Sequence, residues 1–241
     1  MYSDIFCKVY NEFGWNYYPE VFGDDLFRWI SQNDVSIRSA IDLACGTGIL
    51  CERLYAEGIE TWGMDLSEGM IRIACERNRD IHYDVADMTV YCPDRLFDLV
   101  TCTGDAINHI GNLSDVEAIF KHVFAYTAEG GHFIFDLLNE QEISDSEPFE
   151  MDFTDTVRVW FQMTRPSSAT VDLCIKVYED HALQLEEHIR ETIHDPMEIC
   201  DLLRKCGFMI VKCGDQLTDD PDRHAATWYI IAQKPKQEGK Q

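Results

Sequence analysis

Short apolar runs alternate with amphipathic stretches between residue 38 and about residue 137 of the chain. A short apolar run bounded by turn residues is typical of a buried strand, and apolar residues at helical spacing are typical of a helix packed on a sheet. The alternation therefore predicts a parallel sheet covered by helices. The expected strands cover residues 39–44, 61–65, 81–85, 97–103 and 131–136. The expected helices cover 49–57, a segment capped by Ser67, and 115–127.

The rhythm changes at Phe153, where apolar and polar residues begin to alternate one by one. This period of two holds over residues 157–163 and 171–177, on either side of a turn-like sequence at 166–168. Strict alternation indicates strands with one buried face, so these two segments predict an antiparallel hairpin. A third strand is expected over 183–193.

The last part of the chain returns to the pattern of the first. Pro196 is expected to open a helix that runs to Lys205, and Gly207 to end it. The apolar runs 208–213 and 226–232 are then expected to close the parallel sheet as a hairpin.

These elements predict an α/β fold organised around one main domain. A chain of 241 residues lies within the range of one large domain or of one domain that carries an insertion. No linker rich in proline or glycine separates two independent units. We therefore expect residues 1–149 and 196–235 to form the main domain, and residues 150–195 to be inserted as an antiparallel lid or substrate subdomain.

The charge of the chain narrows the classes of partner. The formal net charge is -24 and the isoelectric point is near 4.5, so the chain would repel a phosphate backbone or an anionic membrane surface. No apolar run approaches the roughly 20 residues needed to span a bilayer. We expect no nucleic-acid partner and no membrane association, and a monomer or a homodimer.

The first ten residues and the cysteines indicate a reducing compartment. Residues 1–10 lack the basic start and continuous apolar stretch of a signal peptide, so we expect a cytoplasmic protein. None of the ten cysteines forms a C-x-x-C pair, and Cys200, Cys206 and Cys213 are spaced wrongly for a zinc knuckle. The prediction is reduced thiols, mostly in the core, and no metal site.

The segment from Asp42 to Gly48 carries the main chemical signal. A strand ends there in a tight turn with two glycines and leads into a helix, an arrangement that lets the backbone approach a ligand and offers free N–H groups. Asp65 ends the next strand, where a carboxylate can accept both ribose hydroxyls of a nucleoside. The alternative is an ordinary strand-to-helix turn. Because Asp65 follows in the right place, we favour a nucleotide-like cofactor.

Two residues distinguish this turn from the loop of a dinucleotide-binding site. A dinucleotide loop needs a third glycine three residues after Gly48, but that residue is Cys51. Asp42 is also foreign to the dinucleotide fingerprint, while it suits a site that orients the cationic amino-acid end of a ligand. Both observations favour S-adenosylmethionine over a nicotinamide cofactor.

Four motifs strengthen this choice: IDLACGTG, GMDLSEGMIRIA, YDVADM and FDLVTCTGDAINHI. In this order and spacing the chain resembles class I S-adenosylmethionine-dependent methyltransferases, and GGHFIFDLLN with the closing GFMIV…WYIIAQKP is similar to the family's fifth strand and terminal hairpin. The insertion and the aromatic N-terminal segment resemble bacterial small-molecule methyltransferases, including amino-sugar N-methyltransferases. The resemblance implies a Rossmann-like sheet of seven strands in the order 3-2-1-4-5-7-6, with helices on both faces.

The resemblance also implies roles for individual residues. The methionine and ribose site would be shaped by the first loop, the ribose would be bound by the acid after the second strand, and the adenine would lie between apolar side chains and an acid that accepts from its amino group. In this order the residues are Asp42, Ala44, Gly46 and Gly48; Asp65; Met64 or Leu66, Asp87 and Met88; Thr103 and Gly104 would approach the methionine moiety. The chain departs from the family at Ala44, where the family has the first glycine of the loop.

The N-terminal segment is dense in aromatic residues: Tyr10, Phe13, Trp15, Tyr17 and Tyr18. One reading is a helix packed by its aromatic rings on the sheet. The other is a lid whose tyrosine hydroxyl meets the cofactor carboxylate and whose rings attract the sulfonium cation. We favour Tyr10 and Tyr18 as cofactor-binding residues.

Methyl transfer is an in-line displacement at carbon, so the protein mainly aligns the reactants and excludes water. A base is needed only when the nucleophile must lose a proton. Asp105, Asn108 and His109 follow the fourth strand and are the candidate catalytic residues, with His109 as a base near neutral pH. The alternative is a helix-start aspartate and a surface histidine. His188, Glu191 and His194 in the insertion are expected on a solvated strand face.

The predicted function is transfer of a methyl group from S-adenosylmethionine to N or O of a small metabolite. The acidic field would favour a cationic acceptor such as an amine. Two other functions remain open at this point: a catalytically silent S-adenosylmethionine-binding protein that acts through partner contacts, and a nicotinamide oxidoreductase.

Overall fold

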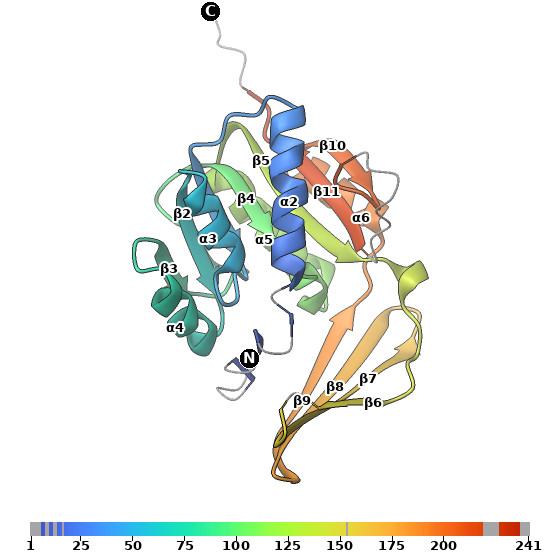
Figure 1. Ribbon diagram of the computed structural model, residues 1–241. Coiled ribbons are helices and arrows are strands. Elements are labelled where there is room, and N and C mark those ends of the chain that lie inside the picture. Colours follow the sequence, from blue (N-terminus) through green and yellow to red (C-terminus); the bar gives the residue numbers. More distant parts are fainter. Residues whose placement is uncertain are drawn as a thin grey trace, which may run out of the picture.

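The chain folds around two sheets (Figure 1). The computed structural model describes residues 6–7, 10–11, 14–15, 17–152, 154–218 and 227–236. A seven-stranded sheet forms the body of the molecule, and a four-stranded sheet extends from its lower edge in the view of Figure 1.

The larger sheet has the strand order β10-β11-β5-β4-β1-β2-β3. Neighbouring strands among β1 to β5 run parallel, whereas β11 runs antiparallel to both β5 and β10. With β10 and β11 as sixth and seventh strands, this is the order 3-2-1-4-5-7-6 implied by the resemblance, so the expected fold class is confirmed. The strands are β1 (Ser39–Leu43), β2 (Glu60–Asp65), β3 (His82–Val85), β4 (Phe97–Cys102), β5 (Thr127–Leu138), β10 (Met209–Gly214) and β11 (Thr227–Gln233).

Helices cover both faces of this sheet (Figure 1). On one face α2 (Tyr17–Gln32) and α3 (Ile49–Ala56) bury apolar side chains against β1, β4, β5 and β11, and on the other face α5 (Leu113–Tyr126) and α6 (Pro196–Lys205) do so. The helix α4 (Glu68–Arg77) packs beside β2 and β3. No helix in the described ranges combines the length and apolar character needed to cross a membrane.

Local sequence explains where two helices begin. Ser67 accepts a hydrogen bond from the backbone N–H of Met70 and so caps α4, as predicted. At α6 the Asp195 side chain accepts from the backbone N–H of Met197, and Pro196 occupies the first turn, where its missing N–H costs no helical hydrogen bond. The predicted bounds of α6 are therefore confirmed.

The smaller sheet consists of β6 (Phe149–Asp152), β7 (Val157–Ser167), β8 (Thr170–Glu179) and β9 (Ala182–Thr192), all antiparallel. The predicted hairpin and third strand are confirmed as β7, β8 and β9. One face of the sheet buries Val159, Ile175 and Leu185 in a cluster with Phe6 of the N-terminal segment and Met70 of α4. The predicted boundary residue Phe153 lies outside the described residues.

The end of β9 is fastened to the turn that follows β4. This turn contains a short 3-10 helix, η1 (Ala106–His109). The Nδ2 of Asn108 donates to the carbonyl oxygen of Thr192 at 2.7 Å, and its Oδ1 accepts from the backbone N–H of Leu138 at 3.1 Å. The Nε2 of His194 lies 3.0 Å from the carbonyl oxygen of Ile110. The two sheets therefore meet at a fixed junction beside η1.

Candidate active site

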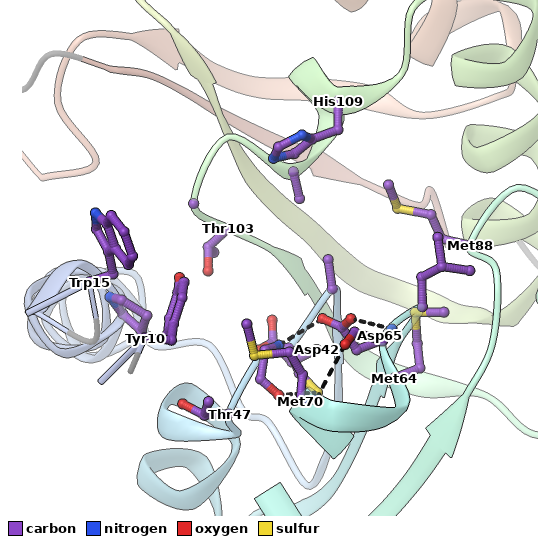
Figure 2. Close-up of a pocket in the computed structure, with 18 of the residues that line it drawn as sticks. Tyr10, Trp15, Asp42, Thr47, Met64, Asp65, Met70, Met88, Thr103 and His109 are labelled. Carbon is purple, nitrogen blue, oxygen red and sulfur yellow. Dashed lines mark hydrogen bonds between the residues drawn. The ribbon is translucent and has the colours of Figure 1, made fainter. Parts of the chain in front are cut away.

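A cavity of about 440 Å³ lies where the carboxyl ends of β1, β2 and β4 meet the N-terminal segment and β9. This is the edge of a parallel sheet at which α/β folds bind ligands. Figure 2 shows Asp42 and Asp65 on one side of this space, His109 on the opposite side, and the rings of Tyr10 and Trp15 along one flank.

The turn after β1 forms one wall. Gly46 has a φ of +53°, its backbone N–H donates to Oδ2 of Asp65 at 2.9 Å, and a Cβ placed on it would meet no atom within 4 Å. A side chain there would enter open space beside the cavity, so the glycine leaves room for a ligand. Gly48 does not line the cavity, contrary to the predicted binding role, since a Cβ on it would lie 2.6 Å from Oη of Tyr83. Gly48 allows α3 to begin close to that ring.

Asp65 joins two loops at the cavity. Its Oδ2 accepts from the N–H of Gly46, and its Oδ1 accepts from the N–H of Ser67 at 2.8 Å. Burial raises the pKa of Asp65, although these hydrogen bonds oppose the shift. Each carboxylate oxygen can accept a second hydrogen bond. The side chain can therefore hold the loops and accept ribose hydroxyls together.

Asp42 is a buried acid that has no cationic partner among the described residues. It is 2% exposed, its Oδ1 accepts from Oγ1 of Thr101 at 2.6 Å, and the thiol of Cys51 approaches its Oδ2 at 3.9 Å. Burial raises the pKa of Asp42 to about 7, and the charge of Asp65 acts in the same direction. A cationic group bound nearby would favour the ionised carboxylate.

The residues around the end of β2 and after β3 have the character expected for an adenine site. Met64, Leu66, Asp87 and Met88 all line the cavity, as does Ala44, which adopts a φ of +52°. Oδ1 of Asp87 accepts from the N–H and from the hydroxyl of one threonine, at 2.8 and 2.7 Å, which fixes the carboxylate at the rim. Met70 of α4 also lines the cavity.

The N-terminal aromatic residues agree partly with the predicted lid over the cofactor and partly with the predicted helix packed on the sheet. Tyr10, Trp15 and Tyr18 line the cavity, and the ring centroids of Tyr10 and Trp15 lie 5.5 Å apart. Burial raises the pKa of both tyrosines. Tyr18 belongs to α2, whereas Tyr17 is 69% exposed. Phe13 lies outside the described residues.

A hydrogen bond fastens this aromatic segment to the cofactor loop. Oγ1 of Thr47 donates to Oδ1 of Asn11 at 2.8 Å. Thr47 itself lines the cavity. The segment that carries Tyr10 therefore covers the turn after β1.

His109 marks the far end of the cavity. Its Nε2 lies 3.7 Å from Oδ1 of Asp105 and 3.8 Å from Oε1 of Glu191. Burial lowers the pKa of His109, so the imidazole is neutral near pH 7. The backbone N–H groups of Gly104 and Asp105 donate to the carboxylate of Asp136 at 2.9 and 3.0 Å, which fixes the turn that carries Asp105.

Three predicted positions need correction. Asn108 is fully buried, does not line the cavity and uses both ends of its amide on backbone groups, so it positions η1 and does not face a substrate. Glu191 and His194 are each 5% exposed, so the expected solvated strand face is wrong for both. His188 is exposed as expected. The end of β9 packs under η1, a contact that the local alternation of residues does not reveal.

The inserted sheet supplies lining residues that the sequence did not indicate. Glu187, His188, Ile189 and Arg190 of β9 reach the cavity. Thr103, the last predicted cofactor residue, lines the cavity together with Gly104. The site is thus assembled from segments that lie more than 80 residues apart in the chain, between Thr103 and Glu187.

Comparison with known proteins agrees with this arrangement. Residues 40–131 match a family model described as a methyltransferase domain. The chain is 27% identical over 226 residues to the putative methyltransferase YqeM of Bacillus subtilis, which covers 88% of this chain and 91% of that one. It is also 27% identical over 129 residues, 54% of this chain and 50% of the relative, to a dTDP-3-amino-3,6-dideoxy-alpha-D-glucopyranose N,N-dimethyltransferase of Streptomyces fradiae.

Two solved structures share the fold. An S-adenosylmethionine-dependent methyltransferase from Clostridium acetobutylicum superposes with a TM-score of 0.76 at 24% identity, over 88% of this chain and 90% of that one. The amino pentose methyltransferase CalS10 of Micromonospora echinaspora superposes with a TM-score of 0.74 at 18% identity, over 97% and 98%. The sheet order, the residues around the cavity and the methyltransferase-domain match over residues 40–131 together support a class I S-adenosylmethionine-dependent methyltransferase.

Proposed function

We propose that this protein transfers the methyl group of S-adenosylmethionine to a nitrogen or oxygen of a small metabolite. The observation that carries the proposal is one cavity of about 440 Å³ that joins the turn after β1 to His109. Its size is that of a small-molecule site. Relatives named for both acceptor atoms support the choice: the amino-sugar N,N-dimethyltransferase and a ubiquinone biosynthesis O-methyltransferase of Coxiella burnetii.

The residues around the turn suit the cofactor. Asp65 would accept hydrogen bonds from the ribose hydroxyls, and Asp87 would accept one from the adenine amino group. Asp42 would interact favourably with the cationic amino-acid end, and Met64 and Met88 would pack on the adenine. The open space at the Gly46 Cα leaves room for such a ligand. The cofactor supplies an electrophilic methyl group on a sulfonium sulfur.

The protein's own contribution to the reaction is alignment, exclusion of water and proton transfer. Tyr10 and Trp15 close the flank of the cavity and offer aromatic faces to a sulfonium cation. His109, neutral near pH 7 and facing the cavity, can accept a proton from the acceptor. Asp105 lies beside it, and Asn108 holds the turn in place.

Calorimetry with S-adenosylmethionine and S-adenosylhomocysteine tests the cofactor half. Asp65→Ala removes the carboxylate that would accept hydrogen bonds from the ribose and that accepts two from loop N–H groups. We therefore expect binding to weaken by about 1.5–3 kcal/mol, the range for charged hydrogen bonds. Asp94→Ala, which removes an exposed aspartate outside the cavity, should leave the dissociation constant unchanged.

Incubation of the protein with isotopically labelled cofactor and a metabolite extract tests the transfer half. A product with one added labelled methyl group on nitrogen or oxygen is expected. A folded protein that binds neither form of the cofactor would contradict the proposal. A product that carries the labelled methyl group on a carbon atom would contradict it as well.

A further inference from the structure

The outward face of the smaller sheet carries three side chains of the kinds that bind metal ions. Side chains alternate along a strand, so Cys174, Glu186 and His188 lie on the face opposite the one that buries Ile175 and Leu185. In the register of β8 and β9, Cys174 lies directly opposite His188. Glu186 precedes His188 by two residues on β9. The pairing of two strands therefore brings the three side chains together.

The three side chains converge on one point. The Sγ of Cys174, a ring nitrogen of His188 and a carboxylate oxygen of Glu186 all lie within 4.8 Å of one another. The Nε2 of His188 is 3.1 Å from Oε1 of Glu186. In a tetrahedral zinc site, bonds of about 2.0–2.3 Å place neighbouring ligand atoms roughly 3.3–3.7 Å apart. Small rotations of these side chains are therefore enough to enclose an ion.

The ligand atoms of this group favour zinc. Thiolate sulfur and imidazole nitrogen are preferred ligands of zinc, whereas Mg²⁺ and Ca²⁺ prefer oxygen atoms. The other such group among the described residues, Asp105, His109 and Glu191, contains no thiol. The side chain of His188 is 70% exposed, so an ion from solvent can reach the outward face.

One neighbouring cation weakens the site. The Nζ of Lys176 lies 3.2 Å from Oε1 of Glu186 and 5.1 Å from the centroid of the Trp160 ring. An ammonium group at this distance from a ligand atom repels a zinc ion. The lysine side chain is flexible, so it can move away from the carboxylate and keep its contact with the ring.

We propose that Cys174, Glu186 and His188 form a zinc site in which a water molecule is the fourth ligand. Cys174 binds as its thiolate, and its proton passes to solvent. Since His188 also lines the cavity, the ion joins β8 to β9 beside it. The spacing of the cysteines along the chain predicted no metal site, but that spacing does not report neighbours on adjacent strands.

Zinc titration of the full-length, reduced protein after treatment with a chelator tests the site. We expect one zinc ion to bind per chain with micromolar or tighter affinity. Cobalt(II) in place of zinc should show a thiolate-to-cobalt absorption and the visible bands of a tetrahedral ion. Millimolar Mg²⁺ should not displace the zinc. Displacement by Mg²⁺ would indicate attraction to the acidic surface as a whole and would overturn the inference.

Variants assign the zinc to the three side chains. Cys174→Ser and His188→Gln should each weaken zinc binding at least tenfold, and the serine variant should lose the thiolate-to-cobalt absorption. Cys92→Ser, which removes an exposed thiol elsewhere in the chain, should bind zinc as the unaltered protein does. Lys176→Met should tighten zinc binding, because it removes the repelling ammonium. Unchanged circular dichroism of the metal-free variants shows that they fold.

Two results with these variants would overturn the inference. One is equal zinc affinity in Cys174→Ser and the unaltered protein. The other is loss of zinc binding in Glu191→Gln with full binding in Cys174→Ser, which would assign the ion to the group around His109. Zinc binding is measured without cofactor or acceptor, so its failure leaves the proposed methyl transfer standing, and a failure of methyl transfer leaves the zinc site standing.

Discussion

Asp42 carries a carboxyl group that the fold makes costly to ionise. Burial raises the pKa of Asp42 to about 7, so the protein without ligand holds a proton there below neutral pH. Because this pKa is raised above that of the unfolded chain, the stability contributed by the protonated group is present at acid pH and is lost as the pH rises through about 7. A cationic ligand bound nearby would lower the pKa of Asp42 and favour its ionised form.

Binding of S-adenosylmethionine should therefore release a proton at pH 6. If the cationic end of the cofactor lowers the pKa of Asp42 below about 5, affinity should rise about tenfold between pH 6 and pH 8. Calorimetry at pH 6 in two buffers of different ionisation enthalpy measures the released proton. Asp42→Asn should remove most of the release. A pH-independent affinity in the unaltered protein would contradict this account.

Gly46 and Gly58 form a matched pair for the cofactor loop. Both have a positive φ, +53° and +79°, and a Cβ on either would meet no atom within 4 Å, but only Gly46 lines the cavity. Replacement by alanine should cost each about 1–2 kcal/mol of folding stability, the penalty of a left-handed conformation. Only Gly46→Ala should also weaken S-adenosylmethionine binding, by at least tenfold. Denaturation and calorimetry separate the two effects, and equal loss of affinity in both variants would move the ligand away from this turn.

At the scale of the elements, regular patterns were predictable and packing partners were not. The parallel strands and α6 follow from apolar periodicity and from caps, which are local properties. The strand β6 was missed because its alternating sequence FEMD is only four residues long, and all four of these residues are exposed. The sequence motif placed Asp65 and Asp87 in the cavity, yet the meeting of Glu191 with His109 joins residues 82 positions apart, and no local rule encodes it.

Asn108 joins the end of β9 to the turn that contains η1, close to the contact between Glu191 and His109. Asn108→Ala should leave the carbonyl of Thr192 and the N–H of Leu138 without their side-chain partner and cost about 1–3 kcal/mol of stability. We also expect turnover to fall more than cofactor affinity, because the junction orients β9 against η1. Asn78→Ala, which removes one exposed side-chain hydrogen bond, is the control for denaturation. A stable Asn108 variant with normal turnover would show that the junction is not needed.

The molecule as a whole is strongly acidic, and its cofactor carries a net positive charge. The net charge of -24 attracts S-adenosylmethionine, whose ammonium and sulfonium outweigh its carboxylate. Long-range attraction of this kind is screened by salt, since the Debye length falls from about 30 Å at 0.01 M to about 8 Å at 0.15 M.

The rate constant for association of S-adenosylmethionine should accordingly fall several-fold between low and physiological ionic strength. The fluorescence of Trp15, which lines the cavity, offers a stopped-flow signal. S-adenosylhomocysteine lacks the sulfonium charge and serves as the control, with a much smaller salt dependence expected. Equal dependence for both ligands would show that the overall field does not guide the cofactor.

The insertion leaves the main sheet after β5 and rejoins it at α6, so the chain from 149 to 192 can vary without interrupting the β1–β5 frame. The cofactor half of the cavity comes from the frame, whereas β9 brings residues 187–190 to the other half. If this segment is exchanged between two relatives of the same fold, the acceptor preference should therefore follow the segment. The β1–β5 frame would keep its cofactor site while the acceptor half of the cavity changes its chemistry.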